Sequence, residues 1–447
     1  MRFRRLRVAL SSLAVMAAVA PLAAESSVLP WIEDDYARAL SEARAKQRPI
    51  FAEAWAPWCH TCRSMRAFVF TDKTLAKDAS RFVWLSIDTE KKQNAAFTAK
   101  YPVKVWPSFY VIDPKSETIT MRWVGGATVG QLEKLFTQAE RAGTGGRKGA
   151  AESLARADGL YSAGKYAEAA PAYREALART PVASPDYARA ADALLWSLST
   201  TKQKKECAQF AREALEKLRT GPSAANLAGV GLDCALETPE GDPGRAEAIA
   251  ALESESRALI ANPRVPMAAD DRSALYASVM NAREDAKDLE GQKKVAAEWV
   301  AYLDAEAAKA ATPEQLTALD PNRLNAFEAA GQIELAIPML EKSAQAFPDD
   351  YNPPARLAYV YLQLKRYDEA LAASDTALAK VYGPRKIRVW LVRADIYRAK
   401  GDVPAARRTL QEAQAYDESL PASQRSESLT AAVKTKLDGL PVQSAGS

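Results

Sequence analysis

Residues 54–62 read Ala-Trp-Ala-Pro-Trp-Cys-His-Thr-Cys, and this stretch decides how the first part of the chain folds. The apolar run at residues 49–56 predicts a buried strand. From Cys59 to Phe70 the apolar side chains recur at helical spacing, which predicts a helix. The two cysteines therefore lie where a strand passes into the start of a helix.

The position of Cys59 at a helix start favours redox chemistry. Unpaired backbone amides and the positive end of the helix dipole lower the pKa of a thiol there and increase its thiolate fraction. Cys62 lies one turn deeper, close enough to form a disulfide and too buried to meet a substrate first. We therefore expect Cys59 to be the attacking nucleophile and Cys62 to be the resolving thiol.

The segments after the motif alternate between strand and helix patterns. We expect strands at residues 82–87, 108–112 and 118–124, and helices at residues 91–99 and 129–141. Such alternation predicts a mixed sheet that helices cover on both faces.

This pattern resembles the thioredoxin superfamily over residues 45–140. The matching residues are Ala54–Cys59 with Cys62, Val83–Asp88, Trp106–Phe109 and Val124–Gly126. The extension Met65–Asp72 is most similar to the periplasmic thioredoxin-like domain of DsbD-type disulfide reductases and to related short thioredoxins. The resemblance implies an α/β thioredoxin fold and thiol–disulfide exchange. It favours reduction, while the residues themselves leave the direction of the reaction open.

The resemblance also implies roles for residues around the motif. Pro107 corresponds to a cis-proline that faces the active site, shapes the substrate groove and keeps metal away from the thiols. The alternative is a proline that only begins a strand. Trp106 stands where a smaller residue is usual, and Trp58 directly precedes the first cysteine, so we expect both to modulate contact with the substrate.

Glu53 lies six residues before Cys59, where thioredoxins carry a buried carboxylate. Burial within the apolar strand would raise its pKa towards neutrality and let it take the proton of Cys62 during resolution. A position on an edge strand, facing water, is the alternative interpretation.

His60 is the single histidine of the chain and lies between the two cysteines. When protonated, it would stabilise the Cys59 thiolate and make the disulfide more oxidising; alternatively, it is an exposed residue of small effect. A hydrolytic triad needs its histidine on a separate element, and a zinc site needs four ligands. No second ligand pair lies near the cysteines, so we expect no metal. The sequence also has no nucleotide or flavin motif, so we expect no cofactor and infer that electrons pass to or from a partner protein.

Beyond Ala150 the strand signals end and a repeated helical pattern begins. The first cycle comprises Gly164, Tyr166, Ala169, Tyr173, Ala176 and Pro181, which return as Gly331, Ile333, Ala336, Leu340, Ser343 and Pro348. Further cycles start at Lys365 and Gly401, at offsets of 34 and 36 residues. Helix pairs of this length, with small residues where the helices cross, are the tetratricopeptide pattern. We predict an all-α solenoid of roughly seven helix pairs, with an irregular alanine-rich bundle as the alternative.

Cys207 and Cys234 are predicted to form a structural disulfide. Each lies 13 to 14 residues from a turn at residues 220–221, so two antiparallel helices would place them side by side. Two unrelated buried thiols are the alternative.

These patterns divide the chain into a signal peptide (1–24), a thioredoxin-like domain (25–141), a glycine-rich linker (142–150), helical repeats (151–438) and a disordered tail (439–447). The signal peptide is expected from four arginines followed by an apolar run and small residues. An uncleaved anchor, cleavage after Ser26, and export by either the Sec or the twin-arginine route stay open.

Residues 1–24 hold four of the 60 basic residues and no acidic one, which leaves 56 residues of each sign. A neutral chain has no broad basic field for nucleic acid, and no membrane span is expected after cleavage. We therefore expect a periplasmic or secreted protein with protein partners: thiol or disulfide substrates, a redox partner, and a protein or peptide in the groove of the repeats.

Two functions fit these features. The first is an exported protein thiol–disulfide oxidoreductase, and the second is a repeat scaffold of an envelope complex in which the thioredoxin-like domain serves for docking.

Overall fold

The computed structural model describes residues 27–144, 149–220, 223–265 and 267–441. The predicted signal peptide, residues 145–148 of the predicted linker and residues 442–447 of the predicted tail lie outside these ranges. Helix α4 (Val129–Thr144) continues past residue 141, and α5 (Ala150–Ser162) begins at residue 150. Helical structure therefore reaches into both ends of the predicted linker.

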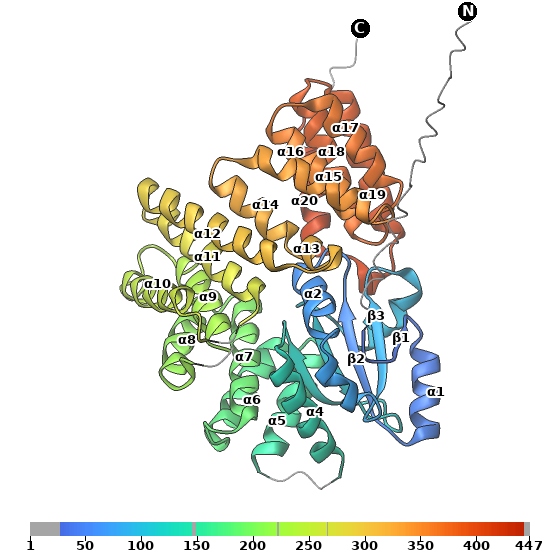
Figure 1. Cartoon of the computed structure of the whole chain (residues 1–447), viewed down its shortest axis with the longest axis vertical. Coiled ribbons are helices and arrows are strands. Elements are labelled where there is room, and N and C mark those ends of the chain that lie inside the picture. Colours follow the sequence, from blue (N-terminus) through green and yellow to red (C-terminus); the bar gives the residue numbers. More distant parts are fainter. Residues whose placement is uncertain (1–26, 145–148, 221–222, 266, 442–447) are drawn as a thin grey trace, which may run out of the picture.

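Within the described residues, the N-terminal unit is a five-stranded mixed sheet with helices on both faces, which confirms the predicted α/β fold (Figure 1). The strands are β1 (Trp31–Glu33), β2 (Ile50–Trp55), β3 (Val83–Asp88), β4 (Ser108–Ile112) and β5 (Ile119–Val124). Their order is β1-β3-β2-β4-β5. The first three run parallel, and β2–β4 and β4–β5 are antiparallel pairs. The strand that leads into the cysteine motif is thus the central one.

The side chains of β2 alternate between two apolar cores, as the pleat of a strand requires. Phe51 packs with Trp84 and Phe136 in the core beneath α4. Ile50 and Ala52 pack in the opposite core, beneath α1 (Tyr36–Lys46) and α3 (Ala95–Lys100). Burial on both faces explains why the sequence of this strand is almost continuously apolar.

Two elements, β1 and α1, lie in a segment for which the sequence predicts none. The three residues of β1 are too few to show an alternating pattern. Helix α1 begins after Asp35, whose side chain accepts the backbone N–H of Arg38 at 2.9 Å. An Asp cap of this kind is a sequence signal for a helix start, so the start of α1 could have been predicted from Asp35.

Residues from Ala150 onward form a helical array, which confirms the predicted helical second half. Its further α-helices are α6 (Tyr166–Arg179), α7 (Pro185–Thr200), α8 (Lys204–Leu218), α9 (Ser223–Leu236), α10 (Arg245–Ala261), α11 (Ala269–Asp285), α12 (Leu289–Lys309), α13 (Pro313–Ala318), α14 (Asp320–Ala329), α15 (Ala336–Ala346), α16 (Asn352–Gln363), α17 (Tyr367–Leu378), α18 (Arg385–Ala399), α19 (Val403–Ser419) and α20 (Glu427–Asp438). A short helical turn, η5 (Ala422–Gln424), precedes α20.

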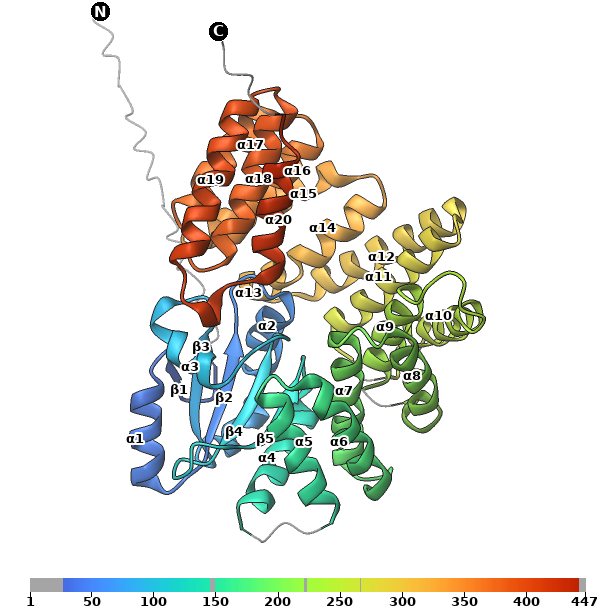
Figure 2. The ribbon, with the colours of Figure 1, turned by 180° about the vertical axis from the view of Figure 1, so that it is seen from behind.

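The array curves around the sheet domain instead of extending away from it (Figures 1 and 2). Helix α5 packs on β5, α11 and α13 contact the helix of the cysteine motif, α2 (His60–Ser64), and η5 contacts α3. The inner side of the array therefore holds the chain's own thioredoxin-like unit. No helix in the described part of the chain has the length and apolar character needed to span a bilayer.

The first of these contacts fixes the start of the array against the edge of the sheet. The guanidinium of Arg122, on β5, lies 4.9 Å from the ring centre of Tyr110 and 4.3 Å from that of Tyr161 on α5. Arg189, on α7, donates from Nη1 to the backbone oxygen of Arg122 at 3.0 Å and also pairs with Asp158. All these side chains are largely buried, so the array covers the edge strand β5.

Candidate active site

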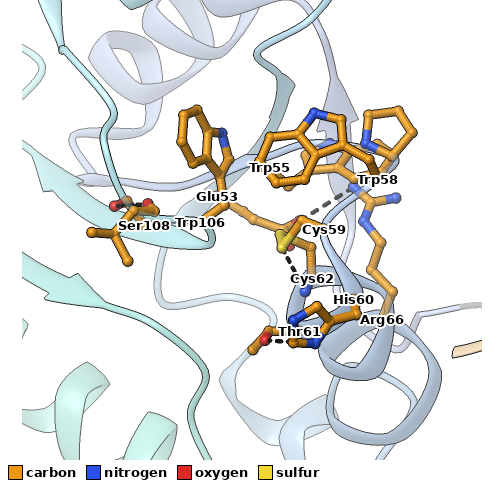
Figure 3. Close-up of a disulfide and its surroundings, with 12 residues drawn as sticks. Glu53, Trp55, Trp58, Cys59, His60, Thr61, Cys62, Arg66, Trp106 and Ser108 are labelled. Carbon is orange, nitrogen blue, oxygen red and sulfur yellow. Dashed lines mark hydrogen bonds and ion pairs between the residues drawn. A yellow bond between two sulfur atoms is a disulfide. The ribbon is translucent and has the colours of Figure 1, made fainter. Parts of the chain in front are cut away.

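Cys59 and Cys62 form a disulfide at the start of α2 (Figure 3). Cys59 is the residue before the helix, in an extended conformation, and its Sγ accepts the backbone N–H of Cys62 at 3.0 Å. The turn that carries it is closed by a hydrogen bond from the N–H of Cys59 to the oxygen of Ala56 at 3.0 Å. The strand-to-helix passage therefore presents the first sulfur to the helix N-terminus, where a thiolate is favoured.

The predicted helix from Cys59 to Phe70 is α-helical only at first. After α2 the chain widens into a π-helical turn at Met65–Val69, closed by a hydrogen bond from the N–H of Phe70 to the oxygen of Met65 at 2.9 Å. Turns of this kind recur at functional sites because they re-aim side chains. Here the widened turn carries Arg66, whose guanidinium reaches Glu53.

Glu53 is completely buried on β2, between Ser86 of β3 and Phe109 of β4. Its Oε2 lies 3.2 Å from Arg66 Nη2, while its Oε1 has no hydrogen-bond partner among the described residues. Burial raises the pKa of Glu53 to about 7, although the charge of Arg66 works in the opposite direction. A carboxyl with this pKa can take up and release a proton near neutral pH.

Arg66 is a member of the site that the sequence prediction missed. Its guanidinium lies 3.7 Å from the ring centre of Trp55, hydrogen-bonds Ser86 Oγ and stands 3.6 Å from Glu33. The available signal was its spacing of four residues from Cys62, which places both on one face of a helix. The side chain of Arg66 is partly exposed, so it extends from the buried carboxyl of Glu53 to the protein surface.

Tryptophans surround the cysteine pair (Figure 3). The rings of Trp58 and Trp106 meet at 5.2 Å between centroids. Trp58 Nε1 donates to Glu90 at 3.0 Å, and Trp106 Nε1 donates to Thr89 at 2.9 Å. The peptide bond between Trp106 and Pro107 is cis, and Pro107 is buried. The predicted modulating residues thus form an apolar wall that limits water around the sulfurs.

The array covers this face of the domain. Arg63 of α2 pairs with Asp350 at 2.6 Å, and Asn352 Nδ2 donates to the oxygen of Pro57 at 3.1 Å. These contacts come from the segment around the start of α16.

A second group of contacts comes from the turn between α17 and α18. Tyr382 donates to Asp88 at 2.5 Å, the N–H of Arg385 donates to Glu90 at 2.9 Å, and the Arg385 guanidinium lies 5.2 Å from the ring centre of Trp58. Gly383, at φ 62°, lies so close to the backbone of Glu90 that a side chain would not fit there. Burial raises the pKa of Glu90 to about 7.

As a result, Cys59 is only 4% exposed and Cys62 is 0% exposed. Its position at a helix start predicts that Cys59 is open to a bulky protein disulfide, and this prediction is wrong for the arrangement observed. The reason is that the array folds back onto the motif, which a local pattern cannot reveal.

His60 also meets the array, because its Nδ1 lies 3.2 Å from Oδ2 of Asp270 on α11. The sequence analysis gave no signal for Asp270, since it lies far along the chain in a segment whose repeats are degenerate.

Cys207 and Cys234 lie on the neighbouring helices α8 and α9 and form the second disulfide, with their Cα atoms 6.0 Å apart. Both cysteines are buried in the core of the array. The pair is therefore separate from the redox motif and placed to hold two helices together.

Two family models match the chain. A thioredoxin-like model matches residues 31–114, and a tetratricopeptide repeat model matches residues 328–385. Among curated proteins, the thiol:disulfide interchange protein DsbD of Pseudoalteromonas atlantica is 25% identical over 95 residues, which are 21% of this chain and 16% of that protein. The match thus spans a small part of the length of that relative.

Among solved structures, a tetratricopeptide repeat protein from Parabacteroides merdae is 12% identical, with a TM-score of 0.41 over 64% of this chain and 98% of that chain. The TPR2AB domain of yeast Sti1, solved as a complex with pHSP90, is 13% identical, with a TM-score of 0.22 over 64% of this chain and 98% of that chain. Fold, cysteine geometry and family matches agree: the chain joins a thioredoxin-like domain, with a close cysteine pair at Cys59 and Cys62, to a helical array that contains tetratricopeptide repeats at residues 328–385.

Proposed function

We propose that the protein is an exported thiol–disulfide oxidoreductase that reduces disulfides in protein substrates. The observation that carries this proposal is the cysteine pair at a helix start with the buried carboxyl of Glu53 on the adjacent central strand. The thioredoxin-like family match and the similarity to DsbD support a redox domain. The repeat array supports a region for protein interaction.

The reaction balances as two thiol–disulfide exchanges. The Cys59 thiolate attacks one sulfur of the substrate disulfide, a mixed disulfide forms, and the other substrate sulfur leaves as a thiolate. Cys62, whose proton passes to Glu53, then attacks Cys59 Sγ. The substrate departs with both sulfurs reduced, and the Cys59–Cys62 disulfide holds the oxidation. A dithiol partner protein must supply two electrons and two protons to restore the reduced pair.

Access to Cys59 needs a movement of the array. Because the arrangement described here leaves 4% of Cys59 exposed, a protein disulfide reaches it only when the contacts around Asp350 and Tyr382 open. The repeats would then select the substrate as well as protect the thiols between turnovers.

Export is part of the proposal. It is supported by the basic-then-apolar start of the sequence and by the structural Cys207–Cys234 disulfide, because such bonds persist outside the reducing cytosol. Recovery of the protein outside the cytosol without residues 1–24 tests this part.

Trapping of partners tests the catalytic part. We expect the full-length Cys62→Ala variant to stop at the mixed disulfide and to accumulate covalent complexes that disappear on reduction of the gel sample. Cys59→Ala should form almost none, because the deeper Cys62 lacks the helix-start position that favours the thiolate. Equal trapping by both variants, or none by either in the exported fraction, would contradict the proposal.

One observation favours the scaffold as a second candidate. A cysteine pair that the array covers this closely can also serve as a structural disulfide that fixes the start of α2 beneath the repeats. In that case, the variant with alanine at both positions 59 and 62 would keep its biological activity. Neither single variant would trap a partner.

A further inference from the structure

The array places one ionised group directly against the redox motif. Asp270 is the second residue of α11, and its side chain is 1% exposed. One carboxylate oxygen lies 3.2 Å from His60 Nδ1, and the other accepts Asn322 Nδ2 at 2.5 Å. A buried carboxylate in this position is an arrangement that requires compensation, because removing a lone charge from water is unfavourable.

The compensation comes from three sides. The N-terminal end of α11 carries positive potential, Asn322 donates a hydrogen bond, and His60 supplies the opposing charge. Burial alone would raise the pKa of Asp270, but the charge of His60 and the donors around the carboxylate hold the pKa below its ordinary value of 3.8. Asp270 therefore stays ionised throughout the neutral range.

His60 in turn is surrounded by groups of both signs. Asp270 and Asp271 face it from α11, and Arg356 faces it from α16. Loss of water around the ring lowers the pKa of His60, yet the negative charge of Asp270, 3.2 Å away, more than offsets this effect. Together, these effects raise the pKa of His60 above its ordinary value of 6.5. The side chain is still 44% exposed, so protons exchange freely with water.

The neighbouring Asp271 does not replace Asp270. Its carboxylate accepts the backbone N–H of Ala268 at 3.3 Å and so caps α11. Burial and the adjacent Asp270 charge raise the pKa of Asp271 to about 6. The carboxylate in contact with His60 is thus that of Asp270.

We propose that Asp270 is a positioning residue of the redox site, which keeps the His60 imidazole charged and oriented beside Cys59 and thereby favours the Cys59 thiolate. The inference rests on the proposed redox function and gives the array a part in the chemistry in addition to partner binding. His60 follows Cys59 directly in the chain, whereas Asp270 contacts the motif at the imidazole, so we expect the imidazolium to act on the sulfur more strongly than the carboxylate. Stabilising the thiolate stabilises the reduced pair and makes the disulfide more oxidising.

The test uses full-length Asp270→Asn in the Cys62→Ala background, where the Cys207–Cys234 disulfide leaves Cys59 as the free thiol. His60 is the single histidine, so an NMR titration of the imidazole follows it without ambiguity. We expect the pKa of His60 to fall below 6.5 in the variant, since the loss of water remains while the carboxylate charge is gone. We expect the Cys59 thiol pKa, read from alkylation rates against pH, to rise by about one unit, which is about tenfold in thiolate fraction below the pKa.

His60→Gln provides a second route to the same result, because it removes the positive charge at a half-exposed position and keeps a polar side chain that can donate to Asp270. It should raise the Cys59 pKa as Asp270→Asn does, and adding Asp270→Asn to it should raise the pKa no further. Asp233→Asn is the matched control, because it removes a partly buried carboxylate beside Asn281, near the far end of α11, and should change neither titration.

The same variants with Cys62 retained give the reduction potential. A tenfold change in the exchange equilibrium corresponds to about 30 mV, and we expect the potential of Asp270→Asn to be lower than that of the wild type. An unchanged Cys59 pKa in His60→Gln overturns the proposal. So does an Asp270→Asn shift that adds in full to the His60→Gln shift in the double variant. These titrations require no turnover, so a failure of the proposed function, seen as absent trapping, stays distinguishable from a failure of this inference.

Discussion

Glu53 has the properties that a proton acceptor for Cys62 needs. It is wholly buried, it faces the single cation of Arg66, and burial raises its pKa to about 7. Because only the ionised carboxylate can accept the proton, the resolution step should accelerate as the pH rises through about 7. Glu53→Gln keeps the shape and a polar contact with Arg66 but cannot ionise. We expect resolution to slow by about 10²-fold and the inflection near pH 7 to disappear, with the first attack by Cys59 much less affected.

Rapid mixing of the reduced enzyme with a small disulfide separates the two steps, since each releases one substrate thiol. Asp192→Asn is a suitable control, because Asp192 is another fully buried carboxyl whose pKa burial raises to about 7, but it lies on α7 of the array. If resolution in Glu53→Gln kept the wild-type rate and pH profile, Glu53 would have no part in proton transfer.

The residues of the site differ in how well the sequence could reveal them. Cys59, Cys62 and Glu53 lie within one short stretch, where strand and helix patterns fix their relative positions. Arg66 lies in the same stretch but reaches Glu53 through a π-helical turn, which residue spacing does not indicate. Asp270 comes from a helix of the array, and a contact between such distant segments leaves no periodic signal in either.

At the scale of elements, the sequence repeats were detected at three turns that carry glycine and at Lys365, but not at the turns around Lys202 and Lys287. Gly164, Gly331 and Gly401 adopt positive φ angles of 73°, 69° and 83° between consecutive helices. Lys202 and Lys287 adopt the same left-handed conformation, at 59° and 56°, although lysine gives no hint of it. The middle repeats therefore keep the geometry of the others while losing their sequence signature.

The Cys207–Cys234 disulfide belongs to this middle region and should stabilise it. It closes a sequence separation of 27 residues between α8 and α9. The loss of chain entropy that such a loop imposes on the unfolded state corresponds to about 3–4 kcal/mol. We expect the double variant Cys207→Ala/Cys234→Ala to unfold at a lower denaturant concentration while it keeps exchange activity at Cys59.

Mass spectrometry of the unreduced protein after alkylation provides the independent check, since neither cysteine should take up the reagent. Alkylation of both in the exported protein, or an unchanged unfolding midpoint in the double variant, would argue that the two thiols are simply core residues.

At the scale of the whole molecule, the array and the thioredoxin-like unit form one enclosed site. The sequence predicts both parts but places the concave side of the repeats toward an outside partner. In the structure this side covers β5, α2 and α3 of the same chain (Figures 1 and 2). The difference arises because local periodicity in the sequence predicts each helix and strand separately. The fit between two surfaces that are distant in the sequence produces no such periodicity. Enclosure makes opening of the array a step that precedes any reaction with a protein disulfide.

Substitution of Tyr382 tests this opening directly, because it should change the equilibrium between the closed and the open arrangement of the array. The Tyr382 hydroxyl donates to Asp88 across the interface at 2.5 Å, and Asp88 is buried, so Tyr382→Phe leaves a carboxylate with one partner fewer only in the closed arrangement. A hydrogen bond to a charged group contributes about 1.5–3 kcal/mol, which predicts at least about tenfold more of the open form.

In the Cys62→Ala background, the rate at which Cys59 reacts with a bulky polymer-linked maleimide should rise relative to the rate with a small maleimide. Tyr359→Phe is the matched control, because Tyr359 donates to Glu328 within the array and not across the interface. Equal rate ratios in the two variants would mean that the interface does not govern access, and that substrates reach Cys59 by another route.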